Sequence, residues 1–172
     1  MKKIALLFIT FLYASILCMS QTAYTEIIYL KANTLEYKYK IYNKSNSATK
    51  GVIVCSTNID TRGYIYLGAN YCRPTKFKGN IQAITNEVLK HYPNEKLPNE
   101  LLIHIYYSLK KETITVGYSY ESPTGEIISP YSLEDLSNAL IKGRKLIELT
   151  MFKPESEFPF DGIYENKTVK IK

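Results

Sequence analysis

The sequence contains no tryptophan, only two histidines and only three cysteines. A catalytic cysteine needs a base to activate it, and neither His91 nor His104 is close in sequence to Cys55 or Cys72. We find no Gly-rich phosphate loop, no HExxH, no CxxC pair and no nucleophile-elbow motif. We therefore predict no metal, no cofactor and no catalytic residue, and the sequence favours a protein that is not an enzyme.

Long apolar runs are also absent after residue 20, and none approaches the roughly 20 residues that cross a bilayer. The run before it is short: Lys2 and Lys3 precede apolar residues that continue to Leu17, and small residues come just before Gln21. A basic start, a short apolar run and a small-residue exit are typical of a secretory signal peptide. We predict a signal peptide over residues 1–20 and a secreted or periplasmic protein.

Cys18 raises an alternative, in which a lipid attached to this cysteine anchors the protein to a membrane. Leu17 lies where such a lipidation motif has a small residue, so cleavage before Gln21 is the favoured prediction. The remaining chain, 21–172, is long enough for a single domain with a hydrophobic core of its own.

Positive charge is not concentrated in any one segment. The formal net charge is +6, and loss of Lys2 and Lys3 with the signal peptide lowers it to +4. The remaining lysines alternate with glutamates, which is typical of a solvated surface and does not favour nucleic-acid binding.

Cys55 and Cys72 are the two cysteines that follow the predicted cleavage site. In an oxidising compartment they are a possible disulfide, which would close a loop of about 17 residues and add roughly 3 kcal/mol of stability. Cys55 follows the apolar run 52–54, so a buried free thiol is the competing interpretation.

Alternating and helical patterns predict an α+β fold, with a mainly antiparallel sheet packed by two amphipathic helices. The segments 101–107 and 113–120 alternate in polarity and are joined by a few polar residues, which predicts a hairpin. A second strand pair is expected from 51–56 and 63–67, and Ile127 and Ile128 are expected to extend the sheet briefly. The other expected strands are 25–31, 36–42 and 163–171, and the first helix is expected around 81–89.

The second predicted helix begins at Ser132-Leu133-Glu134-Asp135, a capping-box pattern in which the serine hydroxyl accepts a hydrogen bond from the N–H group three residues later. Leu133, Leu136 and Leu140 fall on its apolar side, whereas Glu134 points elsewhere. Pro154 prevents the helix from continuing.

From about Ile81 onward the predicted order is helix, strand, strand, helix, strand, and the second helix runs into Phe152-Lys153-Pro154. This order resembles the periplasmic C-terminal domain of TonB-type energy transducers, which has a hairpin, a helix, an aromatic-x-Pro exit and a last strand. The chain departs from that family because it lacks the Asp-Gly hairpin turn, the uncleaved anchor helix and the Pro-rich spacer. The resemblance therefore implies a fold but does not imply energy transduction.

Tyrosine is the conspicuous residue type, with 16 in the chain. On strands, tyrosines fill half-buried faces and cross-strand pairs, which is the favoured interpretation. The sharper alternative is an exposed strip that binds a protein or a glycan, and its candidate residues are Tyr37, Tyr39, Tyr118 and Tyr120.

Two hypotheses on function follow. The favoured one is an exported, non-enzymatic binding or structural module that engages a protein or surface polymer through an exposed sheet face or edge. The alternative is a small secreted hydrolase that uses two carboxylates brought together by the fold. We expect His104 and His91 to be structural, since one lies in an apolar strand and the other near a helix C-terminus.

Overall fold

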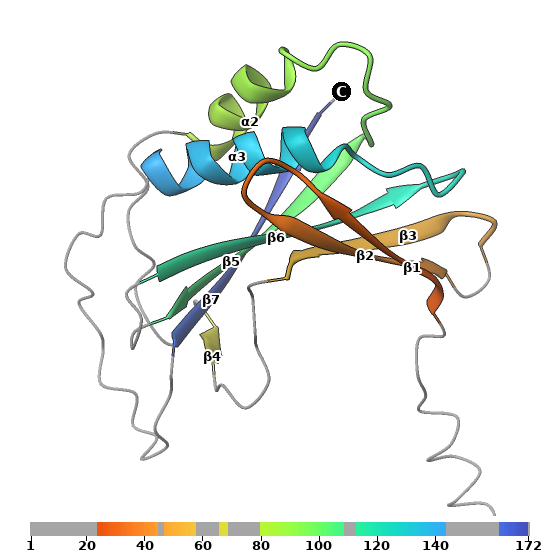
Figure 1. The fold of residues 1–172 in the computed structure, drawn as a ribbon, viewed down its shortest axis with the longest axis horizontal. Helices are drawn as coiled ribbons and strands as arrows, with labels where there is room; N and C mark the ends of the chain where they lie inside the picture. The colour runs from red at the N-terminus through yellow and green to blue at the C-terminus, as the bar shows by residue number, and fades with distance from the viewer. Residues whose placement is uncertain are drawn as a thin grey trace, which may run out of the picture.

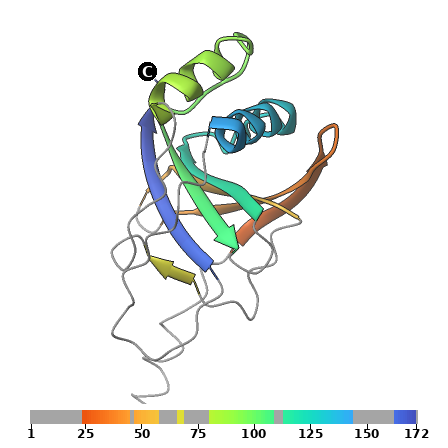
Figure 2. The same cartoon turned by 90° about the vertical axis from the view of Figure 1, so that its left-hand side faces the viewer.

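The computed structural model describes residues 24–44, 47–57, 66–68, 80–108, 113–143 and 162–171. These residues form a seven-stranded sheet in the order β1-β2-β3-β6-β5-β7-β4, and both helices lie on the same side of this twisted sheet (Figures 1 and 2). The α+β class and the mainly antiparallel sheet are as predicted. The predicted signal peptide, including Cys18, lies outside the described residues.

The strands are β1 (Tyr24–Lys31), β2 (Glu36–Asn43), β3 (Lys50–Ser56), β4 (Tyr66–Gly68), β5 (Glu100–Ser108), β6 (Thr113–Ser122) and β7 (Gly162–Lys170). The helices are α2 (Ile81–Leu89) and α3 (Pro130–Gly143). No helix within the described ranges has both the length and the apolar character that a membrane span requires.

Strand β3 lies between β1–β2 on one side of the sheet and β6, β5, β7 and β4 on the other. It pairs antiparallel with β2 on one side and with β6 on the other. The predicted hairpin between β5 and β6 is confirmed, with Ile103 opposite Tyr118 and Ile105 opposite Val116. Strand β7 adds to the other side of β5, so segments far apart in sequence are neighbours in the sheet.

Two of the predicted pairings are wrong. Strand β4 does not form a hairpin with β3, and instead runs parallel to β7 at the sheet edge. Its three residues are too few for a sequence pattern to specify a partner. Ile127 and Ile128 do not extend the sheet, because they lie in the connection that leads into α3, where Ile128 is buried.

Helix α3 begins three residues earlier than the capping-box pattern predicts, with Ser129 and not Ser132 at the N-cap position. The Ser129 hydroxyl accepts a hydrogen bond from the Tyr131 N–H at 3.2 Å, which is the role of an N-cap. The Glu95 carboxylate accepts from Ser129 N at 3.3 Å and from the Ser132 hydroxyl at 2.7 Å. The acidic partner of this helix start therefore comes from another segment, before β5.

The core lies between the helices and the sheet. Leu133, Leu136 and Leu140 of α3 are at most 1% exposed, and they belong to one buried cluster with the helix-side residues of β2, β3, β5 and β6. Alternation along each strand explains this, because every second side chain faces the helices. The opposite face of the sheet carries the remaining side chains and is covered by neither α2 nor α3 (Figure 2).

Candidate functional site

The four tyrosines proposed as partner-binding aromatics lie in the core. Tyr37, Tyr39 and Tyr118 are 0% exposed and Tyr120 is 6% exposed. They do not form an exposed strip, and the prediction of a binding surface at these positions is corrected. The alternation of β2 already carried this signal, since Tyr37 and Tyr39 alternate with charged residues and so share the apolar face.

Each of these tyrosines uses its hydroxyl to connect the sheet to α3 or to the segment before it. Tyr118 bonds to Ser137 Oγ at 2.6 Å, and Tyr39 donates to the Ile128 carbonyl at 2.9 Å. Tyr120 accepts from the Ile128 N–H at 2.8 Å. Burial raises the pKa of Tyr37 to about 12 and raises the pKa of Tyr118 as well, so both remain neutral hydrogen-bonding groups.

The candidate site lies on the opposite side of the sheet, which we call the helix-free face. Pairing places one side-chain row across six strands, from the edge strand β1 to β7. A second row lies next to this one, nearer the carboxyl end of β6, and consists of Ser119, Leu102 and Thr168. The first row consists of Tyr29, Lys38, Cys55, Gly117, His104 and Asn166.

His104 is the centre of a polar cluster on this face. Its Nδ1 lies 2.8 Å from Asn166 Oδ1 and 2.9 Å from the Tyr164 hydroxyl, and its Nε2 lies 2.6 Å from Ser119 Oγ. Because Asn166 Oδ1 can only accept, Nδ1 carries the proton, and Nε2 accepts from Ser119. Burial lowers the pKa of His104, an effect that the Asn166 hydrogen bond opposes, so the ring is neutral at pH 7.

An aromatic row lies beside this cluster. The rings of His104 and Tyr164 are stacked with their centroids 6.1 Å apart, and Tyr106 and Tyr164 are 5.0 Å apart at a tilt of 33°. All three side chains are half-buried. Together they present ring surface next to amide and hydroxyl groups, which is the combination found at the centres of binding interfaces.

Cys55 lies half-buried on the same face and has no disulfide partner among the described residues, and burial raises the pKa of its thiol. A thiol with a raised pKa is a poor nucleophile at neutral pH. A Cβ atom at Gly117 would lie 3.3 Å from the Val54 carbonyl oxygen, which is a tight contact, and 3.7 Å from both Cys55 Sγ and His104 Cβ, which is ordinary van der Waals distance. Cys72 lies outside the described residues, and the disulfide stays a prediction.

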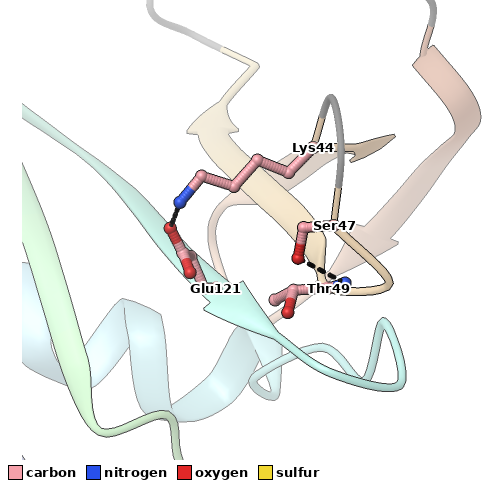
Figure 3. Close-up of polar contacts among 4 residues, drawn as sticks. All are labelled: Lys44, Ser47, Thr49 and Glu121. Carbon is pink, nitrogen blue, oxygen red and sulfur yellow. Dashed lines mark hydrogen bonds and ion pairs between the residues drawn. The ribbon is translucent and has the colours of Figure 1, made fainter.

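An open cleft of about 1130 Å³ adjoins the cluster at one end of the strands. Leu102, Ser119 and Thr168 of the helix-free face line it, together with the segment 95–100 and the end of β6. Lys44 pairs with Glu121 at its border, close to the turn where Ser47 Oγ accepts from Thr49 N at 3.0 Å (Figure 3). Ser119 therefore contacts both the cleft and His104.

Four glutamates line this cleft, which bears on the hydrolase alternative. Glu121 pairs with Lys44, Glu126 pairs with Lys96, and Glu95 holds the start of α3. Glu100 begins β5. Burial raises the pKa of Glu95, although its hydrogen bonds with Ser132 and Ser129 oppose this. Across the described ranges, no three His, Cys, Asp or Glu side chains are grouped so as to hold a metal ion.

The two histidines differ in their surroundings. His104 has hydrogen-bond partners on both ring nitrogens, whereas His91 lies just beyond α2 and is exposed. From the sequence, His104 was expected to be a structural histidine with hydrogen-bond partners, but the partners were not identified, because Asn166 and Tyr164 lie about 60 residues away.

Comparison with known proteins finds no family model, no curated protein and no solved structure that matches this chain.

Proposed function

We propose that this chain is an exported binding module that engages a protein or a surface polymer through its helix-free face. The observation that carries the proposal is the cluster around His104, with its adjoining aromatic row and open cleft. A partner that lies along this face would meet rings, hydroxyls and amides held in fixed positions by their neighbours.

The chemistry of this face favours a partner that offers both apolar and hydrogen-bonding groups. The side chains that hydrogen-bond to His104 are uncharged, whereas Glu100 and Glu121 line the adjoining cleft. Lys38 and Lys40 lie on β2, three strands away from β5. Lys38 Nζ lies 5.5 Å from the centre of the Tyr29 ring, which is within cation–π range.

Export forms the other part of the proposal. It rests on the basic start and short apolar run of residues 1–20, and it places the partner in the periplasm, on the cell surface or outside the cell. The resemblance to TonB-type C-terminal domains is in keeping with a periplasmic module, and supports no activity.

The test compares two tyrosines on opposite sides of the molecule. Tyr164→Ser removes a ring from the aromatic row, whereas Tyr131→Ser removes a 49% exposed ring from α3. Residues 21–172 with each substitution are immobilised and exposed to solubilised envelope polymers and proteins, and retention is quantified. We expect Tyr164→Ser to reduce retention at least tenfold and Tyr131→Ser to leave it unchanged, with equal thermal stability as the check on folding. Equal retention by both variants would contradict the proposal.

A second candidate is the carboxylate-dependent hydrolase. It is favoured by one observation, the raised pKa of Glu95 beside the cleft, which is the property of a general acid. Glu95→Gln should then abolish hydrolysis of a polymer, whereas Glu126→Gln should not. Absence of hydrolysis by the unmodified protein removes this candidate.

A further inference from the structure

The two edges of the sheet are very different in length. Strand β4 forms one edge and has three residues, whereas β1 forms the other and has eight. One side of β1 pairs with β2 from Tyr24 to Lys31, and within the described ranges no strand pairs with its other side. A long edge strand leaves backbone N–H and C=O groups available to another chain.

Apolar side chains are concentrated in the middle of this edge. Ile27 is 47% exposed and Tyr29 is 54% exposed, and they are two of the four large apolar side chains that are exposed in the described structure. Ile28 and Leu30 point to the other face and pack against the core. The charged residues of β1, Glu26 and Lys31, lie towards its ends. The middle of the strand therefore has no charged side chain that would oppose pairing with another chain.

We propose that β1 pairs antiparallel with β1 of a second copy of this chain, about a twofold axis at Ile28. An antiparallel pair keeps side chains on matching faces only when residues of the same parity lie opposite one another. With the axis at Ile28, Ile27 lies opposite Tyr29 of the second copy, and Thr25 lies opposite Lys31. Moving the axis to Tyr29 would instead place Ile27 opposite a lysine.

The self-complementarity of this edge is the reason for choosing a second copy as the occupant. In the Ile28-centred register the two exposed apolar side chains face each other twice, and no charged residue faces a like charge, which favours pairing. After the predicted cleavage before Gln21, only residues 21–23 precede β1, which is too short a segment to cover an edge of eight residues.

The dimer has a consequence for the helix-free face. A twofold axis perpendicular to the sheet leaves the helices of both copies on one side. The two helix-free faces then form one continuous surface on the other side. The inference goes beyond the proposed function, because it concerns a sheet edge and not the His104 cluster, and it shares with that proposal only the predicted cleavage before Gln21.

The experiment measures self-association of residues 21–172 by sedimentation velocity over a wide concentration range. The test variant is Ile27→Lys, and the matched control is Ile141→Lys, which places the same charge at a 38% exposed isoleucine on α3. We expect a reversible monomer–dimer equilibrium that Ile27→Lys weakens about tenfold or more, because each substitution occurs twice in the dimer. The control should dimerise as the unmodified protein does.

Amide hydrogen exchange provides the second measurement. Exchange in residues 25–31 should slow as the protein concentration rises, and should be independent of concentration in Ile27→Lys. A protein that is monomeric at all concentrations, or a dimer that Ile27→Lys does not weaken, overturns the inference. Concentration-dependent protection elsewhere but not in β1 overturns it equally.

Discussion

Glu134 joins helix α3 to a turn about 100 residues earlier in the chain. Its carboxylate accepts hydrogen bonds from Asn33 N at 2.7 Å, from Thr34 N at 3.0 Å and from the Thr34 hydroxyl, and its side chain is 2% exposed. Burial acts to raise the pKa of Glu134, but the hydrogen bonds from Thr34, Asn33 and Leu35 together outweigh it and lower the pKa. The ionised carboxylate is therefore the form that the fold stabilises.

Replacing Glu134 should weaken the fold through this turn. Glu134→Ala leaves the N–H groups of Asn33 and Thr34 without their acceptor, and we expect the free energy of unfolding to fall by about 1–3 kcal/mol. Denaturant titration measures the change. The control is Glu87→Gln on α2, where the exposed pair with Lys90 should contribute little. A Glu134→Ala protein as stable as the unmodified one would show that the turn does not need this carboxylate.

His104 gives the stability a pH dependence of defined sign. Its pKa in the folded protein is lowered by burial, so below about pH 6.5 the unfolded chain binds a proton that the folded chain does not. Stability should therefore fall as the pH decreases from 7 to 5.5. Denaturant titrations at both pH values measure this, and His104→Gln should have a smaller difference between them. An equal difference in the variant would mean that other groups cause it.

The hydrogen-bond partners of residues such as Glu134 could not be predicted from the sequence. The sequence pattern placed Glu134 away from the core, because its helical position is off the apolar side. Its partners are backbone N–H groups of a distant turn, and no local pattern encodes such a pairing. The same applies to His104, whose role was predicted from its apolar strand but whose partners were not.

At the scale of elements, α3 is attached to the sheet by hydroxyl groups as well as by apolar packing. Ser137 Oγ lies 2.6 Å from the Tyr118 hydroxyl and 3.5 Å from the Tyr37 hydroxyl, and it donates to the Leu133 carbonyl at 2.8 Å. All of these groups are buried. Their geometry fixes where the helix lies along β2 and β6.

Tyr118→Phe tests this attachment. The substitution keeps the ring but removes the hydroxyl that contacts Ser137 and the Leu133 carbonyl, so we expect a loss of about 1 kcal/mol of stability. Tyr131→Phe, at an exposed position on α3, is the matched control and should leave the stability unchanged. Thermal or denaturant unfolding measures both, and an unchanged Tyr118→Phe protein would assign the attachment to apolar packing alone.

Alternation in the sequence predicted the strands of the hairpin β5–β6 and the strand β2 closely, because one face of each is continuously apolar. It did not predict that β3 lies between β2 and β6. Register and neighbour are decided by contacts between strands that are far apart in sequence. The helix-free face was unpredictable for the same reason, since its rows combine residues from six strands.

At the scale of the whole molecule, the described strands form a single sheet with one core, and one domain over residues 21–172 stays a prediction. We expect this segment to unfold in one cooperative transition. Coincident denaturation curves from far-UV circular dichroism and tyrosine fluorescence test this. Two separated transitions would indicate two independent units.

The predicted signal peptide has its own measurement. Expressed from its native promoter, the protein should be recovered outside the cytoplasm with Gln21 as its first residue, which N-terminal sequencing determines. A Ser20→Arg substitution should prevent processing, because the cleavage site requires small residues. Protein that retains Met1 and remains in the cytoplasm would contradict the prediction of export.

The position of β3 affects how the chain can fold during synthesis. The meander β1–β2–β3 is complete at Ser56, but β6, which covers its other side, begins only at Thr113. A nascent chain therefore carries a three-stranded ribbon in which one edge of β3 is unpaired until much of the remaining sequence has emerged. A chaperone that shields extended segments would have its longest opportunity to bind during this interval.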